Sequence, residues 1–149
     1  MRGLLLALLL SGCAAPSRLV VGESLSLNAA ELQSVGDRPV LIDVWASWCE
    51  RCTAVVRRHA EVMARAGNGA RHVGWNVDAS GTHAERTAAN LPGSALVVRD
   101  PAARRLLKAM PIDHLPTTLL LGTDDRLLFV NETFEDDAGL LRALGTKSR

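Results

Sequence analysis

Blocks of apolar residues alternate with polar, helix-forming stretches along the chain, and this alternation predicts strands that take turns with helices. The first block, Val40-Leu41-Ile42-Asp43-Val44, is apolar at every position but one, which is typical of a central strand covered on both faces. Further strands are predicted at residues 25–27, 71–77, 95–98, 117–121 and 127–130. Helices are predicted at residues 28–36, 49–66, 82–90, 101–110 and 136–144. This order predicts an α/β sandwich with a mixed central sheet and a closing antiparallel hairpin.

Two cysteines directly follow the first block, in the sequence Cys49-Glu50-Arg51-Cys52. A helix that starts at Cys49 places its thiol on free backbone N–H groups at the positive end of the helix dipole, which favours the thiolate. Cys52 lies one turn further along, within bonding distance. The spacing predicts a redox pair, because a structural disulfide usually joins distant segments. A zinc site is the alternative; it needs two more ligands, of which His59 is the nearest candidate, and no second cysteine pair exists.

Asp43 and Pro116 are two further residues at which we expect chemistry. A carboxyl group inside an apolar strand loses its hydration, so we expect burial to raise the pKa of Asp43. The alternative is an edge strand on which Asp43 faces water. Pro116 precedes the strand at 117–121, and we expect a cis bond between Leu115 and Pro116, since cis bonds are essentially confined to those before proline.

The N-terminus predicts export. Arg2 precedes an apolar stretch at 4–10 that is too short to span a bilayer and has the size of a secretory signal. The residues Leu-Ser-Gly-Cys that end at Cys13 resemble the bacterial lipoprotein processing box, in which the cysteine is lipidated and becomes the first residue of the mature chain. An ordinary signal with an incidental cysteine is the alternative. We expect a signal peptide at 1–12, a lipidated Cys13 with a tether at 13–22, and one domain at 23–149.

Lipidation would also account for the cysteine count and the compartment. With Cys13 acylated, an even pair of cysteines is left for an oxidising compartment. Several acyl chains on one residue would anchor the protein stably to a membrane. Ala14 in the next position, rather than Asp, points to the outer membrane of a two-membrane bacterium. The predicted location is the bacterial cell envelope, lipid-anchored and facing the periplasm.

Composition limits the remaining classes of function. The 149 residues fit a single domain with its own core. The net charge is +1, and no run of Lys or Arg is long enough to suggest a nucleic-acid surface. We expect a monomer without a cofactor or a metal.

The chain resembles the thioredoxin family over residues 25–144, on the motif residues Asp43, Trp45, Ala46, Trp48, Cys49, Cys52 and Leu115-Pro116-Thr117-Thr118. The resemblance implies a thioredoxin fold, a three-layer α/β/α sandwich. Between Asp78 and Pro116 the predicted helix, strand and helix form an insertion before the cis-Pro strand. This insertion is similar to that of the TlpA/ResA-type membrane-tethered thioredoxins.

The resemblance also implies roles for the motif residues. Cys49 would attack a substrate disulfide, and Cys52 would resolve the mixed disulfide. Asp43 would lie beneath the pair and accept a proton from Cys52. The cis-Pro116 loop would offer the backbone of Leu115 to an extended substrate segment.

The residues around the nucleophile depart in part from the family pattern. Trp48 is expected to form an exposed apolar rim for docking, together with Glu50 and Arg51, which stand where thioredoxin has Gly-Pro. Arg51 favours the Cys49 thiolate and Glu50 disfavours it. The sequence therefore does not indicate whether the reduction potential is raised or lowered. Gly74 replaces a lysine that lies near the acid in thioredoxin, which we expect to raise the pKa of the acid further.

Together these inferences predict an extracytoplasmic thiol–disulfide oxidoreductase that exchanges disulfides through Cys49 and Cys52 and reduces protein disulfides. A membrane or periplasmic partner would supply or accept the electrons. The alternative is a binding module, a copper(I) metallochaperone that uses the two thiolates with His59 or His114. In the family the cis-proline keeps metal away from the cysteine pair, which argues against this alternative.

Overall fold

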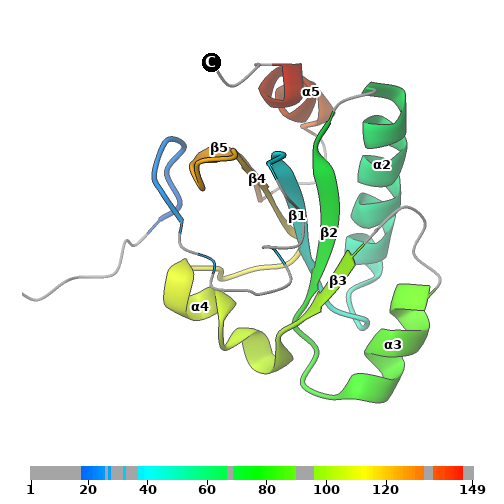
Figure 1. Cartoon of the computed structure of the whole chain (residues 1–149). Coiled ribbons are helices and arrows are strands. Elements are labelled where there is room, and N and C mark those ends of the chain that lie inside the picture. Colours follow the sequence, from blue (N-terminus) through cyan, green and yellow to red (C-terminus); the bar gives the residue numbers. More distant parts are fainter. Residues whose placement is uncertain are drawn as a thin grey trace, which may run out of the picture.

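The structure, a computed structural model, describes residues 18–25, 27, 32, 37–66, 69–89, 96–132 and 136–145. Five strands form one sheet in the order β3-β2-β1-β4-β5 (Figure 1). Their bounds are β1 Val40–Trp45, β2 Arg71–Asn76, β3 Leu96–Arg99, β4 Thr117–Leu121 and β5 Leu127–Asn131. The strand pairs β1–β2 and β2–β3 are parallel, whereas β4 is antiparallel to both β1 and β5. The predicted mixed sheet with a closing hairpin is confirmed.

Helices cover both faces of the sheet (Figure 1). On one face α2 and α5 pack over a core that includes Leu41, Val62 and Leu140. On the other face α4 and the N-terminal segment pack over a second core, to which Leu19, Leu106 and Met110 contribute. The bounds are α2 Glu50–Ala66, α3 Gly81–Ala89, α4 Leu106–Ala109 and α5 Asp137–Gly145. The layers are those of the predicted three-layer sandwich, with α3, β3 and α4 inserted between β2 and β4.

The central strand β1 positions the functional side chains. All six of its side chains are buried, because it has a neighbouring strand on each edge and a helical layer on each face. Successive side chains of a strand point to opposite faces. Leu41, Asp43 and Trp45 therefore face α2, while Ile42 and Val44 join the core under α4.

The close approach of Trp45 explains why position 74 of β2 is a glycine. A Cβ atom at Gly74 would lie 2.9 Å from Nε1 of Trp45, closer than side-chain carbons are found to other atoms. The indole of Trp45 is itself fully buried. The ring thus occupies the space over Gly74 in which a longer side chain would have to lie.

The predicted helix at 101–110 is interrupted. Pro101–Ala103 forms a 3₁₀ turn, in which Ala102 has a φ of 56° and Ala103 a φ of 54°, so the chain leaves helical geometry before α4 begins at Leu106. Asp100 directly precedes this turn, but its side chain makes no capping hydrogen bond to it. Its carboxylate instead accepts the backbone N–H groups of Arg105 and Leu106, each at 2.9 Å. The sequence predicted one continuous helix at 101–110. In the structure the carboxylate of Asp100 binds the start of α4, and a separate 3₁₀ turn precedes that helix.

Several predictions concern residues outside the described ranges. These are the signal peptide at 1–12, Cys13, the first part of the tether at 13–22, and all of the helix at 28–36 except Leu32. Within the ranges that the structure describes, none of the helices has the length and apolar character that crossing a membrane requires.

Candidate functional site

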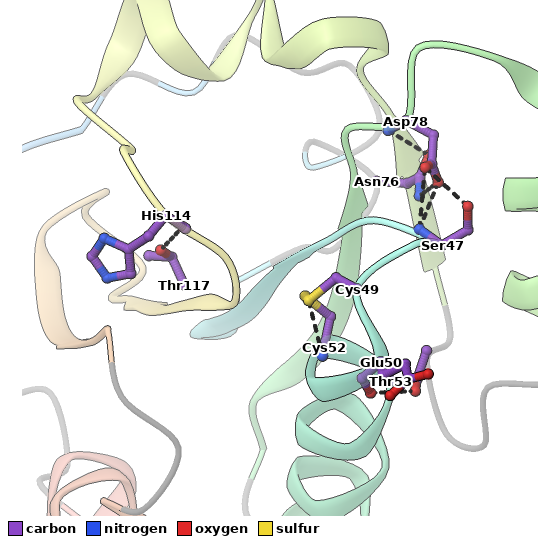
Figure 2. Close-up of a disulfide and its surroundings, with 9 residues drawn as sticks. All are labelled: Ser47, Cys49, Glu50, Cys52, Thr53, Asn76, Asp78, His114 and Thr117. Carbon is purple, nitrogen blue, oxygen red and sulfur yellow. Dashed lines mark hydrogen bonds between the residues drawn. A yellow bond between two sulfur atoms is a disulfide. The ribbon is translucent and has the colours of Figure 1, made fainter.

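Cys49 and Cys52 are joined by a disulfide at the start of α2, with their Cα atoms 5.3 Å apart (Figure 2). The two cysteines differ in accessibility: Cys52 is fully buried, whereas Cys49 is partly exposed. An incoming thiolate can therefore contact Cys49, and Cys52 is shielded. This is the asymmetry that separates an attacking from a resolving cysteine.

The backbone around the pair favours negative charge on Cys49. The N–H group of Cys52 donates a hydrogen bond to Sγ of Cys49 at 3.2 Å, and the N–H group of Cys49 donates to the carbonyl of Ala46 at 3.1 Å. The first turn of α2 leaves N–H groups without helical partners, and its dipole is positive at this end. Once the disulfide is reduced, this environment stabilises a thiolate at Cys49.

The loop before β4 lies against the pair. The peptide bond between Leu115 and Pro116 is cis, as predicted. Leu115 packs against the cluster of Trp45, Cys52 and Val56. A segment remote in sequence thus borders the disulfide.

The side chain of His114 has its polar contacts away from Cys49 and Cys52. Its ring nitrogens face carboxylates, Nδ1 at 2.5 Å from Asp113 and Nε2 at 3.9 Å from Glu132. Figure 2 shows the ring directed away from Cys49 and Cys52. Among the described residues, the side chains close enough together to share a metal ion are these three, Asp113, His114 and Glu132, all of them exposed.

An apolar hollow lies between α4 and the loop at residues 46–49, which connects β1 to α2. It has a volume of about 200 Å³, and its walls include Trp48, Leu107, Ile112 and Leu115. Trp48 is 72% exposed and Leu107 is 53% exposed. Glu50 and Arg51 are exposed at the start of α2. The hollow joins the residue before Cys49 to the residue before the cis-proline.

Asp43 is fully buried and has three hydrogen-bond partners. Its Oδ1 lies 2.8 Å from Nδ1 of His59 and accepts the hydroxyl of Thr118 at 2.7 Å, while its Oδ2 lies 2.7 Å from Nε2 of His72. His59 and His72 are also buried. We call these four residues, Asp43, His59, His72 and Thr118, the buried acid cluster.

The prediction of a raised pKa for Asp43 is wrong. Burial raises the pKa of this carboxyl, but the hydrogen bonds with His59 and His72 and the electrostatic attraction between the carboxylate and these side chains outweigh burial. Together they hold the pKa of Asp43 well below its usual range. The expectation took account of the water that burial removes from the carboxyl group, and not of the hydrogen-bond donors that replace this water. The alternative of an edge-strand Asp43 facing water is excluded as well.

The two histidines escaped sequence reasoning for different reasons. His59 lies seven residues after Cys52 on the same face of α2, and it was weighed only as a metal ligand. His72 comes into place through strand register, because Gly74 pairs with Asp43 and His72 precedes it by two residues on the same face of β2. The sequence did offer one signal for this contact: an acid in a buried strand, followed by a histidine on the next helix.

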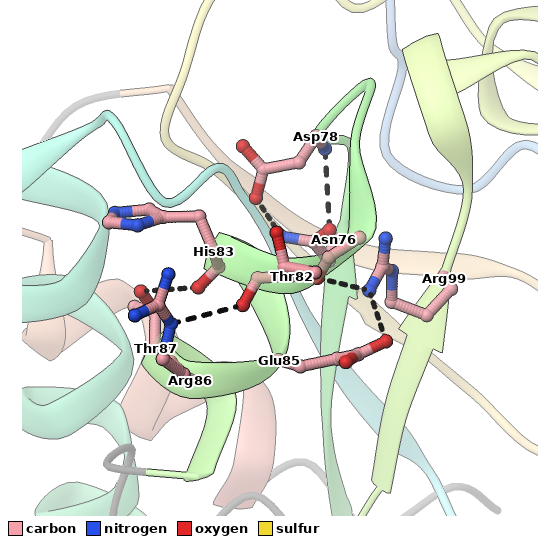
Figure 3. A network of polar contacts seen from close by, with 9 residues as sticks. Asn76, Asp78, Thr82, His83, Glu85, Arg86, Thr87 and Arg99 are labelled. Atoms are coloured by element: carbon pink, nitrogen blue, oxygen red, sulfur yellow. Dashed lines mark hydrogen bonds and ion pairs between the residues drawn. The ribbon is translucent and has the colours of Figure 1, made fainter.

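A second buried carboxylate was not predicted. Asp78 follows β2 and accepts hydrogen bonds from Ser47, in the loop between β1 and α2, and from the side chain of Asn76 (Figures 2 and 3). It connects the loop that carries Trp48 and Cys49 to the sheet.

Comparisons with known proteins agree on the fold. No family model and no curated protein matches the chain. A solved structure of a thiol:disulfide interchange protein DsbE from Chlorobium tepidum is 23% identical and has a TM-score of 0.65, covering 86% of this chain and 100% of that one.

Two further solved structures are similar. The thioredoxin domain of a thiol-disulfide oxidoreductase from Bacteroides vulgatus is 18% identical with a TM-score of 0.63, over 81% of this chain and 88% of that one. An exposed lipoprotein thioredoxin from Streptococcus pneumoniae is 22% identical with a TM-score of 0.59, over 76% and 87%. The chain therefore has the thioredoxin fold.

Proposed function

We propose that the chain is an extracytoplasmic thiol–disulfide oxidoreductase that uses Cys49 and Cys52. The observation that carries the proposal is the disulfide at the start of α2, with one partly exposed and one buried cysteine beside a cis-proline loop. A dithiol in that position can exchange electrons with another disulfide without a cofactor. Many proteins that share the fold are named as thiol–disulfide oxidoreductases, which supports the proposal.

The reaction moves two electrons from the dithiol to a substrate disulfide. The Cys49 thiolate attacks one substrate sulfur, the substrate S–S bond breaks, and the other substrate sulfur leaves as a thiolate. The Cys52 thiolate then attacks Sγ of Cys49, which forms the Cys49–Cys52 disulfide and releases the second substrate thiolate. The substrate is reduced and the pair is oxidised. A dithiol partner in the membrane or the periplasm would return the electrons by the reverse steps.

Asp43 fits the role of proton acceptor for Cys52 poorly. Its two carboxylate oxygens already bind His59, His72 and Thr118. We assign the proton of Cys52 to the leaving substrate thiolate instead. The buried acid cluster then stabilises the sheet–helix interface under the pair.

The apolar hollow supports a polypeptide substrate. A partner that presents its disulfide to Cys49 must lie over Trp48 and Leu115, which also line the hollow. An extended segment can place an apolar side chain there while the backbone of Leu115 pairs with it. Protein disulfides are therefore the proposed substrate class.

Reduction of insulin disulfides tests this function. The full-length chain with dithiothreitol is expected to accelerate the reaction, Cys49→Ser to abolish it, and Cys52→Ser to accumulate a mixed disulfide with the substrate. Pro116→His opens the pair to metal and is expected to slow turnover. Stoichiometric copper(I) binding by the wild type without dithiol activity would contradict the proposal and favour the metallochaperone.

The direction of electron flow follows from the potential of the pair. Equilibration with glutathione measures it, and the proposed reductase predicts a value near that of thioredoxin, about −270 mV. A value near that of DsbA, about −120 mV, would contradict reduction and indicate an oxidant.

We also propose that Cys13 is lipidated and that the protein is attached to the cell envelope, facing the periplasm and sorted to the outer membrane. The signal-like N-terminus motivates this, and the fold shared with an exposed lipoprotein thioredoxin supports it. Mass spectrometry of the mature N-terminus should find acylated Cys13. In Cys13→Ser the protein should leave the membrane fraction, and an unmodified Cys13 in the wild type would contradict the proposal.

A further inference from the structure

We propose that Asp78 is a positioning residue that holds the redox loop in place for thiolate formation at Cys49. The redox loop is residues 46–49, between β1 and α2. The inference rests on the proposed dithiol function and concerns the same site. It assigns to Asp78 an effect on sulfur chemistry, exerted through Ser47.

The bonds between Asp78 and Ser47 fix both the position and the direction of the loop. The backbone N–H group of Ser47 donates to both carboxylate oxygens of Asp78, at 3.1 and 2.9 Å. The hydroxyl of Ser47 donates to Oδ1 of Asp78 at 3.0 Å (Figure 2). Hydrogen bonds to a carboxylate are among the stronger ones in proteins. One residue of the loop therefore has its backbone and its side chain held by one acceptor.

Asp78 is in turn fixed to the sheet. It is 5% exposed, and Nδ2 of Asn76 donates to its Oδ2 at 2.7 Å (Figure 3). Asn76 is the last residue of β2, is fully buried, and accepts the backbone N–H group of Asp100 at 2.8 Å. The anchor of the loop is thus the end of two sheet strands and not a mobile surface group.

The position of Ser47 bears on the sulfur of Cys49. Ser47 lies inside the turn that is closed by the bond from the N–H group of Cys49 to the carbonyl of Ala46. The turn places Sγ of Cys49 at 3.2 Å from the N–H group of Cys52. If Ser47 moves, this N–H···S contact loses its alignment, and the thiolate of the reduced protein loses a donor.

The charge of Asp78 has the opposite effect, so the two roles can be separated by sign. A nearby anion disfavours a thiolate, and its removal alone would make Cys49 more reactive. Loss of positioning would make Cys49 less reactive. Ser47→Ala changes the hydrogen bonding and leaves the charge.

The test is the rate at which iodoacetamide alkylates Cys49, measured against pH in the full-length chain with Cys52→Ser, which keeps the backbone N–H group of that residue. We expect alkylation at neutral pH to slow about threefold in Ser47→Ala and about tenfold in Asp78→Asn, within the range of hydrogen bonds to charged groups. The midpoint of the pH profile should rise in both. The double variant should be no slower than Asp78→Asn, because both changes act on the same pair of residues.

Asp100→Asn is the matched control. Its carboxylate is also buried and also accepts backbone N–H groups, but those of Arg105 and Leu106 at the start of α4. It should lower stability without changing the alkylation rate. Faster alkylation in Asp78→Asn, or a wild-type rate in Ser47→Ala, would overturn the positioning role. Failure of the wild type to reduce insulin would contradict the dithiol function while leaving the alkylation comparison intact.

Discussion

The surroundings of Asp43 decide its behaviour at the scale of a single residue. Both carboxylate oxygens are occupied by partners from three elements, His59 of α2, His72 of β2 and Thr118 of β4. A buried carboxylate with that many donors is stabilised as an anion. Removing one donor leaves the charge without compensation, which costs more than the bond contributed.

His72→Phe is expected to lower the free energy of unfolding by about 3 kcal/mol, since the buried carboxylate of Asp43 loses its partner on Oδ2. Urea unfolding followed by tryptophan fluorescence measures the change. His83→Phe is the control, because His83 is exposed on α3 and should tolerate the change. A loss below about 1 kcal/mol would show that the contact matters little.

The pH dependence of stability has a defined sign at Asp43. In the unfolded chain we take the pKa of this carboxyl as the ordinary value, 3.8, and folding lowers it. The folded state therefore binds fewer protons in acid, so the stabilisation is present above about pH 4 and is lost as the pH falls below it.

Unfolding free energies of the wild type and Asp43→Asn, measured from about pH 6 downward, should show this loss. The difference between the two proteins is expected to narrow below about pH 4, where the unfolded carboxyl becomes protonated. A difference that stays constant or widens towards acid would mean that the pKa of Asp43 is not lowered by folding.

At the scale of elements, the packing of β1 against β2 depends on the absence of a side chain at Gly74. Both Gly74 and the indole of Trp45 are buried, and the ring lies where a Cβ would project. A methyl group forced into a filled interior shifts side chains and backbone. The close approach also bears on the site, because Trp45 packs against Cys52.

Gly74→Ala is expected to lower the free energy of unfolding by about 2 kcal/mol, the typical cost of overpacking. Gly69→Ala is the matched control just before β2, since a Cβ there would meet no atom within 4 Å. Chemical denaturation of both variants measures the contrast. Equal effects at the two positions would contradict the packing account.

At the scale of the whole molecule, the apolar hollow lies on only one side of Cys49, the side of α4. Leu107 of α4 is exposed at its wall, whereas Leu141 of α5 is exposed on the opposite layer. A polypeptide bound over Trp48 would cover the first leucine and not the second. A small disulfide could react at Cys49 without covering either.

Leu107→Glu is therefore expected to raise KM for insulin about tenfold, since losing the burial of one leucine costs about 1.5 kcal/mol. The rate with the small disulfide 5,5′-dithiobis(2-nitrobenzoic acid) should stay unchanged. Leu141→Glu, the control, should alter neither reaction. An equal effect of Leu107→Glu on both substrates would place the defect in the cysteine pair and not in docking.

Much of the fold was predictable because its signals are local. The continuous apolar run at β1, the spacing of Cys49 and Cys52, and the proline before β4 each lie within a few residues. Contacts made across the sheet were not predictable in this way. The bonds from His72 to Asp43 and from Ser47 to Asp78 join residues 29 and 31 positions apart, and depend on strand register. The predicted direction of the pKa shift of Asp43 was therefore wrong, whereas the predicted pairing of Cys49 with Cys52 is confirmed.

The buried acid cluster has a consequence for divergence among homologous chains. An interior anion that has lost one imidazole is a defect, and so is an interior imidazole that has lost its anion. Positions 43, 59 and 72 are therefore expected to mutate in concert, so that a sister lineage retains both histidines with the aspartate or has exchanged all three for apolar residues.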